Sequence, residues 1–514
     1  MSEKDPLVPK KAVSLDAAPT TSTITESDQS NGHGQQDDRV AKESIMHDVL
    51  DTFKLGIPIF ISSLSFVGKK TTDTALLGHV SQEALSASAL SDLWTMTSQV
   101  LLSGGVLGVF IGSAVGANNP QLAGIYLQVS LVVLFTMSLI VIVAWNFTEF
   151  VWLKFGSDPE ISEMAGYYAR TLSFAIPGMV CFAQLSQFFS AQRIMSPEVN
   201  AASFGLVCNL FFGLIFVLGW PSSLFPNFDG YGFWACPIVT SAVTYFQLAF
   251  ILIIYVYIQK LHEKCWPGWQ LSEITFKRIR TFCELYFPAA LSLGSDFWRV
   301  AVIGSIAAKL GETEVAVFNT SYRICWIALI FVGSLAGASS INMSLRLGKH
   351  EPWGARQAGA VGIALSFVML TILSILLLIR PRLIMMIFTQ DEEFLTLFEG
   401  ASLPFVVTLF FMNMSVAIER IPYSMGRTKE VFWMGFVASW GGQVPGVILL
   451  TTYWRNDLVG LYWGMAIGYF FLTILYGLIA ARSDWEHYAH MAQERAESKP
   501  AVAKEISTEP AVDV

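Results

Sequence analysis

Residues 123–145 read AGIYLQVSLVVLFTMSLIVIVAW, a continuous stretch without a charged side chain. The hydrocarbon core of a bilayer is about 30 Å thick and requires about 20 mainly apolar residues for one helical crossing. This stretch is long and apolar enough to cross once, so we predict a transmembrane helix here. Similar stretches recur along the chain, which predicts an all-α membrane protein.

These apolar stretches occupy most of the sequence. We predict twelve transmembrane helices, which begin near Leu55, Leu93, Ala123, Tyr167, Ala201, Trp234, Phe287, Val315, Ala360, Leu403, Val431 and Leu458. Only 14% of the 514 residues are charged, whereas a soluble domain carries about 25% charge, so a soluble protein is excluded. Much of the net charge of −8 lies in the two tails and says little about nucleic acid, but no clustered basic patch appears, so we expect no nucleic-acid partner.

The links between the predicted helices are mostly short, so consecutive helices are expected to run antiparallel. The longest link joins the sixth and seventh helices and carries Lys260, Lys264, Lys277, Arg278 and Arg280. Cytoplasmic links are enriched in lysine and arginine, which places this link in the cytoplasm. Because twelve is an even number, both termini are predicted to be cytoplasmic. The membrane itself is either the plasma membrane or a vacuolar or other endomembrane.

Five segments follow from this pattern. Residues 1–48 form a polar cytoplasmic tail that lacks the apolar content needed to order itself. Residues 49–258 form an N-lobe with helices one to six, and residues 259–283 form the basic cytoplasmic linker. Residues 284–482 form a C-lobe with helices seven to twelve. Residues 483–514 are a second cytoplasmic tail with the same polar composition.

The two halves share features in the same order and at a nearly constant offset. Gly116 and Pro120 have counterparts in Gly348 and Pro352, and the segment around Asp158 has a counterpart around Asp391. A repeat with six spans inserts both copies in the same orientation. This is the parallel-repeat plan of secondary transporters, in which the substrate site lies between the halves. We therefore predict two parallel six-helix lobes.

Two further patterns limit the chemistry. Gly104, Gly108, Gly112 and Gly116 recur every four residues, a spacing that favours close packing of transmembrane helices. No group of histidine, cysteine and carboxylate residues has metal-ligand spacing, and no nucleophile–base pattern appears. We therefore expect no catalytic residue, no metal site and no bound cofactor, and predict that the chain is not an enzyme.

Several motifs resemble the multidrug and toxic compound extrusion (MATE) family, in its eukaryotic form. They are Pro58, the segment Asp73-Thr-Ala-Leu-Leu-Gly78, the segment Gly116-Ala-Asn-Asn-Pro120 and the segment Gly460-Leu-Tyr-Trp-Gly464. The resemblance extends from about Leu55 to Arg495 and rests on the order and spacing of the motifs. It implies an antiporter that exports small organic compounds, usually cations, and is driven by a proton or sodium gradient.

The resemblance assigns an ion site to the N-lobe. Asp73 matches the family's coupling-ion aspartate, and Asn209 and Thr240 match further polar positions of that site. Gly213 stands where the family has a second carboxylate, which weakens a sodium site because the cation would lose a charged ligand. Alternatively, Asp73 is a structural carboxylate paired with lysine, and Asn209 and Thr240 are hydrogen-bonding residues in helix packing.

In the C-lobe, Asp296 and Trp298 resemble the family's acidic-Trp-Trp site, with aspartate in place of glutamate and Phe297 in place of the first tryptophan. Alternatively, Asp296 forms a simple ion pair with Arg299, and Trp298 is an ordinary packing residue. The family's acidic position in the tenth helix falls near Asn413, which is neutral, and Glu419 follows about two turns later. Either Glu419 replaces that acid or it lies close to the membrane surface. Gln192, at a helix end, is either a substrate contact or an ordinary interfacial side chain.

Cations accompany both predicted aspartates. Lys69 and Lys70 lie four and three residues before Asp73, and Arg299 lies three residues after Asp296, so each pair shares a helix face. Intramembrane charges are costly and therefore indicate function. Either proton or substrate binding displaces these pairs, or Lys70 and Arg299 bind an anionic or zwitterionic substrate.

We therefore predict a monomeric antiporter with alternating access between two lobes in the bilayer. Asp73, Asn209, Thr240 and Asp296 would bind the coupling ion. The predicted substrate contacts are Lys70, Gln192, Trp298, Arg299, Asn413 and Glu419. The alternatives are a lipid-linked oligosaccharide flippase of the same superfamily, which the intramembrane cations support, and a channel or receptor.

Overall fold

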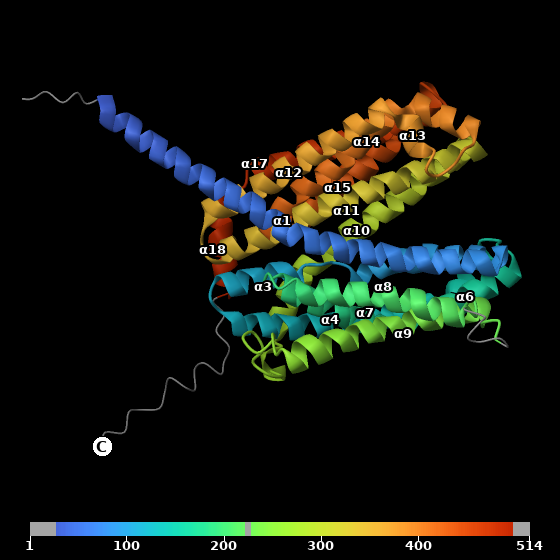
Figure 1. Cartoon of the computed structure of the whole chain (residues 1–514), viewed down its shortest axis with the longest axis horizontal. Coiled ribbons are helices and arrows are strands. Elements are labelled where there is room, and N and C mark those ends of the chain that lie inside the picture. Colours follow the sequence, from blue (N-terminus) through green and yellow to red (C-terminus); the bar gives the residue numbers. More distant parts are fainter. Residues whose placement is uncertain (1–26, 221–227, 497–514) are drawn as a thin grey trace, which may run out of the picture. The chain divides into compact units, whose positions relative to one another are not determined.

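The computed structural model describes residues 27–220 and 228–496, and these residues form helices joined by short links (Figure 1). The first half contains α1 (Ser27–Val80), α2 (Gln82–Gln99), η1 (Val100–Leu102), α3 (Leu107–Gly116), α4 (Pro120–Asn146), α5 (Thr148–Lys154), α6 (Pro159–Ser173), α7 (Ile176–Ser190), α8 (Ser196–Phe216), η2 (Gly232–Ala235), α9 (Cys236–Phe250) and η3 (Ile251–Ile258). The second half contains η4 (Leu271–Glu273), α10 (Phe276–Leu310), α11 (Glu312–Gly348), α12 (Pro352–Ile379), α13 (Pro381–Met385), α14 (Glu392–Ser424), α15 (Thr428–Phe436), η5 (Val437–Gln443), α16 (Val444–Tyr453), α17 (Leu458–Ala481) and α18 (Trp485–Ala496).

The transmembrane count agrees with the sequence. Ten helical segments among the described residues are long and apolar enough to cross a bilayer, and the pair α6 and α7, bent by 50°, makes an eleventh when it is counted as one broken span. The twelfth is α10, which has 35 residues but carries Asp296, Arg299 and further charges that lower its apolar character. The chain is an all-α membrane protein with twelve helices in two parallel six-helix lobes.

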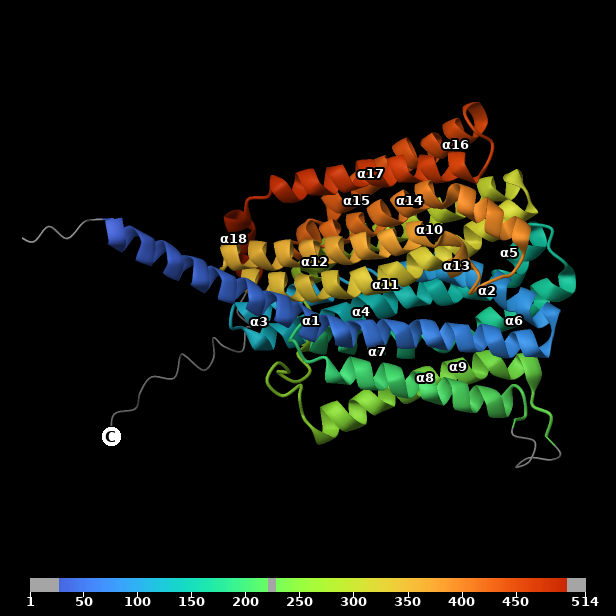
Figure 2. The ribbon, with the colours of Figure 1, turned by 45° about the horizontal axis from the view of Figure 1, so that its top comes forward.

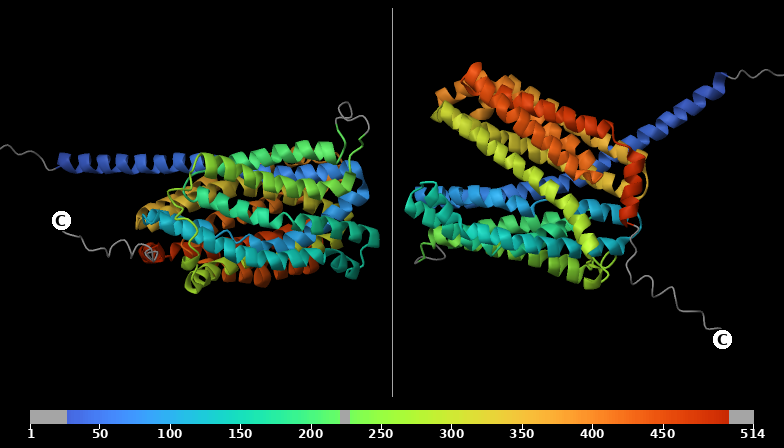
Figure 3. Two further views of the ribbon diagram at one scale, coloured as in Figure 1. Left: turned by 90° about the horizontal axis from the view of Figure 1, so that it is seen from below. Right: turned by 180° about the vertical axis from the view of Figure 1, so that it is seen from behind.

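Each lobe has its own apolar core. One core joins side chains from Leu76 to Ala290, and the other joins side chains from Ile303 to Ile479. The boundary between the cores falls inside α10: Tyr286 belongs to the N-lobe core, whereas Ile303 belongs to the C-lobe core. Figure 3 shows α10 (yellow-green) crossing from one bundle to the other. The seventh helix is therefore shared by both lobes.

The lobes meet along α3 and α11, where glycines allow backbone contact. A Cβ atom on Gly116 would stand 2.2 Å from the Leu345 carbonyl oxygen, and one on Gly348 would stand 2.3 Å from the Ser113 carbonyl oxygen. At Gly116, the glycine stripe therefore allows the close helix packing that the sequence predicts. At Gly108 it does not contribute to packing, because a Cβ atom there would meet nothing within 4 Å.

We predict that Gly116→Ala destabilises the closed α3–α11 contact by about 1–3 kcal/mol, because the added methyl group overlaps backbone atoms. The thermal unfolding midpoint in detergent micelles should fall clearly below that of the unmodified protein. Gly108→Ala is the matched control, since it makes the same change in the same helix without a clash. Equal midpoints for the two variants would contradict a tight contact at Gly116.

The structure differs from the sequence expectation near the C-terminus. Residues 485–496 form α18, whose first turn is capped by the Asp484 carboxylate and whose Ala489 and Ala492 are buried against α11, α12 and α14. The Asn119 amide donates to the Ala496 carbonyl oxygen at 2.8 Å, which ties α18 to the link between α3 and α4. At the other end α1 begins at Ser27, inside the predicted tail, and residues 1–26 lie outside the described part.

Candidate functional site

The N-lobe holds a buried carboxylate with two hydrogen-bond donors. Asp73 lies on α1 and is only 4% exposed. Its Oδ1 accepts a hydrogen bond from Asn209 Nδ2 on α8 at 2.8 Å, and its Oδ2 accepts one from Thr240 Oγ1 on α9 at 3.0 Å. The structure thus brings together the three N-lobe residues that the sequence analysis grouped as an ion site.

Thr240 is placed to serve two forms of this carboxyl group. Its hydroxyl has one proton but two acceptors within reach, Asp73 Oδ2 at 3.0 Å and the Cys236 carbonyl oxygen at 3.1 Å. When Asp73 is ionised, Thr240 donates to it. When Asp73 is protonated, the acid donates to Thr240 Oγ1, whose own proton turns to Cys236. The same geometry therefore offers hydrogen bonds to the charged and the neutral acid.

The neighbouring lysines do not pair with Asp73. Lys70 Nζ lies 2.7 Å from Asp92 Oδ1 on α2, and Lys69 Nζ donates to Gln247 Oε1 on α9 at 2.7 Å. The close pairing of these lysines with Asp73, one reading of their spacing, is therefore wrong. Asp92 was not recognised from the sequence because it precedes the predicted start of the second helix at Leu93, although α2 begins at Gln82.

In the C-lobe, Asp296 and Arg299 form the expected ion pair, with Oδ1 and Nη2 3.0 Å apart. The two partners differ in burial, because the Arg299 side chain is 4% exposed and that of Asp296 is 49% exposed. Arg299 also donates to Ser439 on the π-helical segment η5 and to the Tyr469 hydroxyl on α17 at 3.1 Å. Its guanidinium carbon lies 4.9 Å from the Tyr469 ring centroid, a cation–π distance.

The other predicted substrate contacts differ in their surroundings. Glu419 interacts electrostatically with Arg420, Asp296 and Arg299, so it belongs to the C-lobe charge cluster. Trp298 follows Asp296 in α10 and is 40% exposed. Asn413 is buried and donates to the Leu409 carbonyl oxygen of its own helix at 2.9 Å.

Gln192 does not join either group of charges. Its amide donates to the Phe188 carbonyl oxygen at 2.7 Å, and its Oε1 accepts from Cys265 Sγ at 3.1 Å in the link between the sixth and seventh helices. Burial raises the pKa of this thiol above its ordinary value. Gln192 therefore holds the linker against the end of α7.

The second transmembrane helix is broken between α2 and α3, a feature that the sequence analysis missed. Gly105 has a φ of +64°, and the residues around it leave backbone groups without helical partners. The Tyr286 hydroxyl donates to the Leu101 carbonyl oxygen at 2.9 Å and accepts from Gly104 N at 3.2 Å, while the Tyr423 hydroxyl donates to the Gly104 carbonyl oxygen. Such partners are required, because unpaired backbone groups are costly inside a bilayer.

Charged side chains join the lobes near the start of the α1 span. Asp48 on α1 pairs with both Nη atoms of Arg346 on α11 and accepts from Gln357 on α12 at 2.9 Å. Asp51 on α1 accepts from Asn342 Nδ2 on α11 at 3.4 Å, and it also pairs with Arg193 in the α7–α8 link of its own lobe. We call Asp48, Asp51, Asn342 and Arg346 the α1–α11 latch. Farther along the same two helices, near the middle of each span, the Phe60 and Phe331 rings stack with centroids 4.4 Å apart, so α1 and α11 also contact there. Figure 2 shows α1 and α11 in the two lobes.

The charge clusters do not form a metal centre. No group of three or more His, Cys, Asp or Glu side chains within residues 27–220 and 228–496 could hold a metal ion. Asn209 Oδ1 is buried and lacks a hydrogen-bond partner within the same ranges, so it is an acceptor that a water molecule could use. The arrangement therefore consists of a buried ionisable carboxyl group with two hydrogen-bond partners at Asp73 and an ion pair of unequal burial at Asp296 and Arg299.

Comparisons with known proteins agree with this architecture. The family model described as MatE matches residues 58–215 and 288–448, one segment in each lobe. An uncharacterised transporter of Schizosaccharomyces pombe is 22% identical over 447 residues, which cover 86% of this chain and 80% of that protein. Multidrug and toxin extrusion protein 1 of Xenopus tropicalis is 23% identical over 466 residues, covering 89% and 78%. The crystal structure of the eukaryotic MATE transporter AtDTX14 has a TM-score of 0.78 at 19% identity, covering 88% of this chain and 100% of that one.

Proposed function

The chain belongs to the MatE family of membrane transporters, and from that premise we propose that it exports small organic compounds in exchange for protons. It is not an enzyme, as members of this family are transporters. The observation that carries the proposal is the buried Asp73, for which Thr240 has a hydrogen-bonding arrangement in both protonation states. A residue with this property can load and unload a proton without losing its partners.

Proton loading at Asp73 changes the charge of the N-lobe interior. An isolated ionised carboxylate in a low-dielectric site costs several kcal/mol, whereas the neutral acid costs much less. An arrangement of the lobes that exposes Asp73 to water therefore favours the ionised form, and one that encloses it favours the protonated form. This differential stabilisation is what alternating access requires, because a ligand shifts an equilibrium only through unequal affinity for its states.

Protons fit this site better than sodium ions. A sodium site requires several oxygen ligands, usually with more than one carboxylate, whereas the hydrogen-bond partners of Asp73 within residues 27–220 and 228–496 are the neutral Asn209 and Thr240, and Gly213 stands where the family has a second carboxylate. Lys70 and Lys69 also lie within electrostatic range of Asp73 and disfavour a second cation. We assign coupling to protons on this basis.

The C-lobe cluster would bind the substrate. Arg299 presents a permanent positive charge, and Asp296 and Glu419 present acids in its electrostatic range. A zwitterionic organic compound fits this combination, with its cationic group at the half-exposed Asp296 and its anionic group toward Arg299. Trp298, partly exposed on the same helix, would cover an aromatic or aliphatic part of the compound.

A lipid-linked oligosaccharide flippase is the second candidate, and the intramembrane cations Lys70 and Arg299 favour it. However, each cation already has an acidic partner, Asp92 at 2.7 Å and Asp296 at 3.0 Å. A diphosphate group would have to displace both acids. The antiporter is therefore the better assignment.

We further propose that both termini are cytoplasmic and that the chain acts as a monomer in the plasma membrane or an endomembrane. The basic link 259–283 defines the cytoplasmic side. The α1–α11 latch lies at the end of α1 and α11 that this rule places in the cytoplasm. With the lobes joined at this end, the proposed orientation makes this a state that is closed toward the cytoplasm.

We predict that Arg346→Ala weakens this closed state. Loss of the pair between Asp48 and Arg346 removes charge-assisted hydrogen bonds worth about 1.5–3 kcal/mol, which shifts the two-state equilibrium about 10- to 100-fold. Spin labels at positions 121 and 349, in a background without native cysteines, should report longer distances across the lobes. Arg382→Ala is the control, because its partner Glu392 lies in the same lobe. Unchanged distances in Arg346→Ala would contradict the role of the latch.

Purified protein in liposomes tests the function directly. Proton and sodium gradients are imposed separately, and uptake of zwitterionic, anionic and cationic organic compounds is measured for each. Uptake driven by the proton gradient alone supports the proposal. Uptake that ignores both gradients refutes antiport, and flux that does not saturate with solute concentration indicates a channel.

A further inference from the structure

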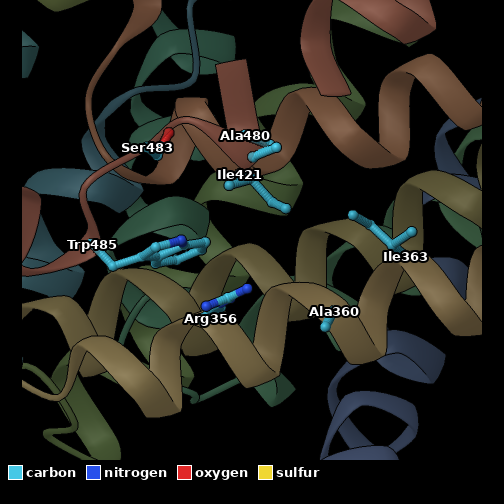
Figure 4. A pocket seen from close by; sticks show the side chains of 8 residues that line it. Arg356, Ala360, Ile363, Ile421, Ala480, Ser483 and Trp485 are labelled. Atoms are coloured by element: carbon cyan, nitrogen blue, oxygen red, sulfur yellow. The ribbon is translucent and has the colours of Figure 1, made fainter. Parts of the chain in front are cut away.

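A hollow of about 240 Å³ lies at the end of the C-lobe that carries α18, and its lining includes none of the residues assigned to ion or substrate binding. It is lined by Arg356, Ala360, Ile363, Ile421, Ala480, Ala481, Ser483 and Trp485 (Figure 4). One wall is α12, and the opposite wall is the end of α17 with the start of α18. The function proposed above does not use this hollow.

The hollow has a cationic end. Arg356 is exposed, and no carboxylate among the described residues pairs with it. Neighbouring arginines differ in this respect, because Arg346 pairs with Asp48 and Arg427 pairs with Glu430. Ser483 is already engaged, since it accepts from Arg427 Nη1 at 2.6 Å and donates to the Ile479 carbonyl oxygen at 2.7 Å. Arg356 is therefore the group in this hollow that is available to an anion.

The rest of the hollow is apolar and continues into the membrane span. Ala360 and Ile363 lie one and two turns after Arg356 on the same face of α12, a helix long and apolar enough to cross the bilayer. Ala480 and Ala481 on α17 face them with small side chains that leave a groove. Trp485 lies at the cationic end, the depth at which tryptophan prefers the membrane–water interface.

A charged end at the interface and an apolar groove along two transmembrane helices match the two parts of a lipid. We propose that this hollow is a binding site for an anionic phospholipid, whose phosphate contacts Arg356 and whose acyl chain lies along Ala360 and Ile363. Basic pockets between transmembrane helices on the cytoplasmic side bind anionic headgroups for the same electrostatic reason. The volume accommodates the headgroup region, while the acyl chain would extend along the lipid-facing groove.

A bound lipid would connect α12 with α17 and α18, which are otherwise joined by few polar contacts. The lipid would lie against α12 on one side and against α17 and α18 on the other. Because α18 also contacts α3 and α11, the lipid would stabilise the end of the molecule at which the lobes meet. The expected consequence is greater thermal stability in anionic lipid, independent of the transported solute.

Native mass spectrometry of the full chain tests the site, with phosphatidylglycerol and phosphatidylcholine added separately to detergent micelles. We expect wild type to retain phosphatidylglycerol preferentially. Arg356→Gln should reduce this retention about fivefold, the factor for loss of one basic contact. Ala360→Phe, at an exposed position, should reduce it while leaving the charge intact, because the ring fills the groove. Lys349→Gln, an exposed basic residue outside the lining, is the control that should retain the lipid.

Three outcomes would overturn the site. They are equal phosphatidylglycerol retention by wild type and both lining variants, equal retention of phosphatidylcholine and phosphatidylglycerol by wild type, and complete displacement of the lipid by inorganic phosphate. The last outcome would indicate a phosphate site without an acyl-chain contribution. None of these outcomes depends on transport, so the test is separate from that of the antiporter.

Discussion

Asp73→Asn is expected to abolish accumulation of substrate driven by a proton gradient. For a one-to-one exchange with the membrane potential held at zero, each pH unit stores about 1.4 kcal/mol and supports about tenfold accumulation. Asparagine cannot bind and release the proton, so the accumulation ratio of the variant should approach one at any imposed gradient. The measurement is steady-state solute accumulation in liposomes at pH differences of one and two units.

The structure also predicts that this variant folds. Asparagine has nearly the shape of aspartate and can still hydrogen-bond with Asn209 and Thr240, and the substitution removes a charge that is costly to bury. Its thermal unfolding midpoint should equal or exceed that of wild type, which separates loss of coupling from loss of structure. Asp158→Asn, an exposed cap of α6 where asparagine caps equally well, is the control. Proton-driven accumulation retained in Asp73→Asn would remove this residue from the mechanism.

The sequence was informative where the physical signal is local or repeated. Apolar stretches predicted the helices, and the repeated order of Pro120 and Pro352 predicted the two lobes. The grouping of Asp73, Asn209 and Thr240 came from the family resemblance, and the structure places their side chains within hydrogen-bond distance. The shared helix face of Asp296 and Arg299 correctly predicted an ion pair, because three residues is close to one helical turn.

The same spacing argument was wrong for Lys70, and the reason is tertiary. A lysine has a long flexible stem, so a carboxylate on a neighbouring helix competes with one on its own helix. Asp92 on α2 provides that partner, and no pattern along α1 reveals it. The break at Gly105 is similar, because its tolerance in the membrane depends on Tyr286 and Tyr423 from distant parts of the chain.

Order after Arg482 could have been predicted from a local signal. Asp484 precedes a helical stretch and caps its first turn, and Ala489, Ala492 and Ala496 recur on one face. Overall composition concealed this pattern, because polar residues dominate the surrounding segment. Small alanine side chains bury little area each, yet they let α18 approach α11 and α12 closely.

The C-lobe ion pair should respond asymmetrically to removal of its two partners. Asp296→Asn leaves the buried Arg299 guanidinium without its acid, whereas Arg299→Met leaves a carboxylate that is half exposed. An uncompensated buried charge destabilises the folded state by about 3–5 kcal/mol. For Asp296→Asn we expect a loss of about 3 kcal/mol, because solvent and the Ser439 and Tyr469 hydroxyls still stabilise the Arg299 charge. Arg299→Met should cost clearly less, and the double variant should recover most of the stability lost in Asp296→Asn.

These variants should also change substrate selection. If Arg299 binds an anionic group, Arg299→Met lowers uptake of anionic and zwitterionic compounds while cation uptake is retained or increased, since the variant leaves the Asp296 carboxylate without its paired cation. Lys70→Met supplies the comparison for the N-lobe cation, which pairs with Asp92. Uptake is measured with solutes of matched size and different charge, beside unfolding midpoints for each variant. If neither Lys70→Met nor Arg299→Met altered uptake of any charge class, both cations would be structural, and the substrate would have to be recognised by groups other than these pairs.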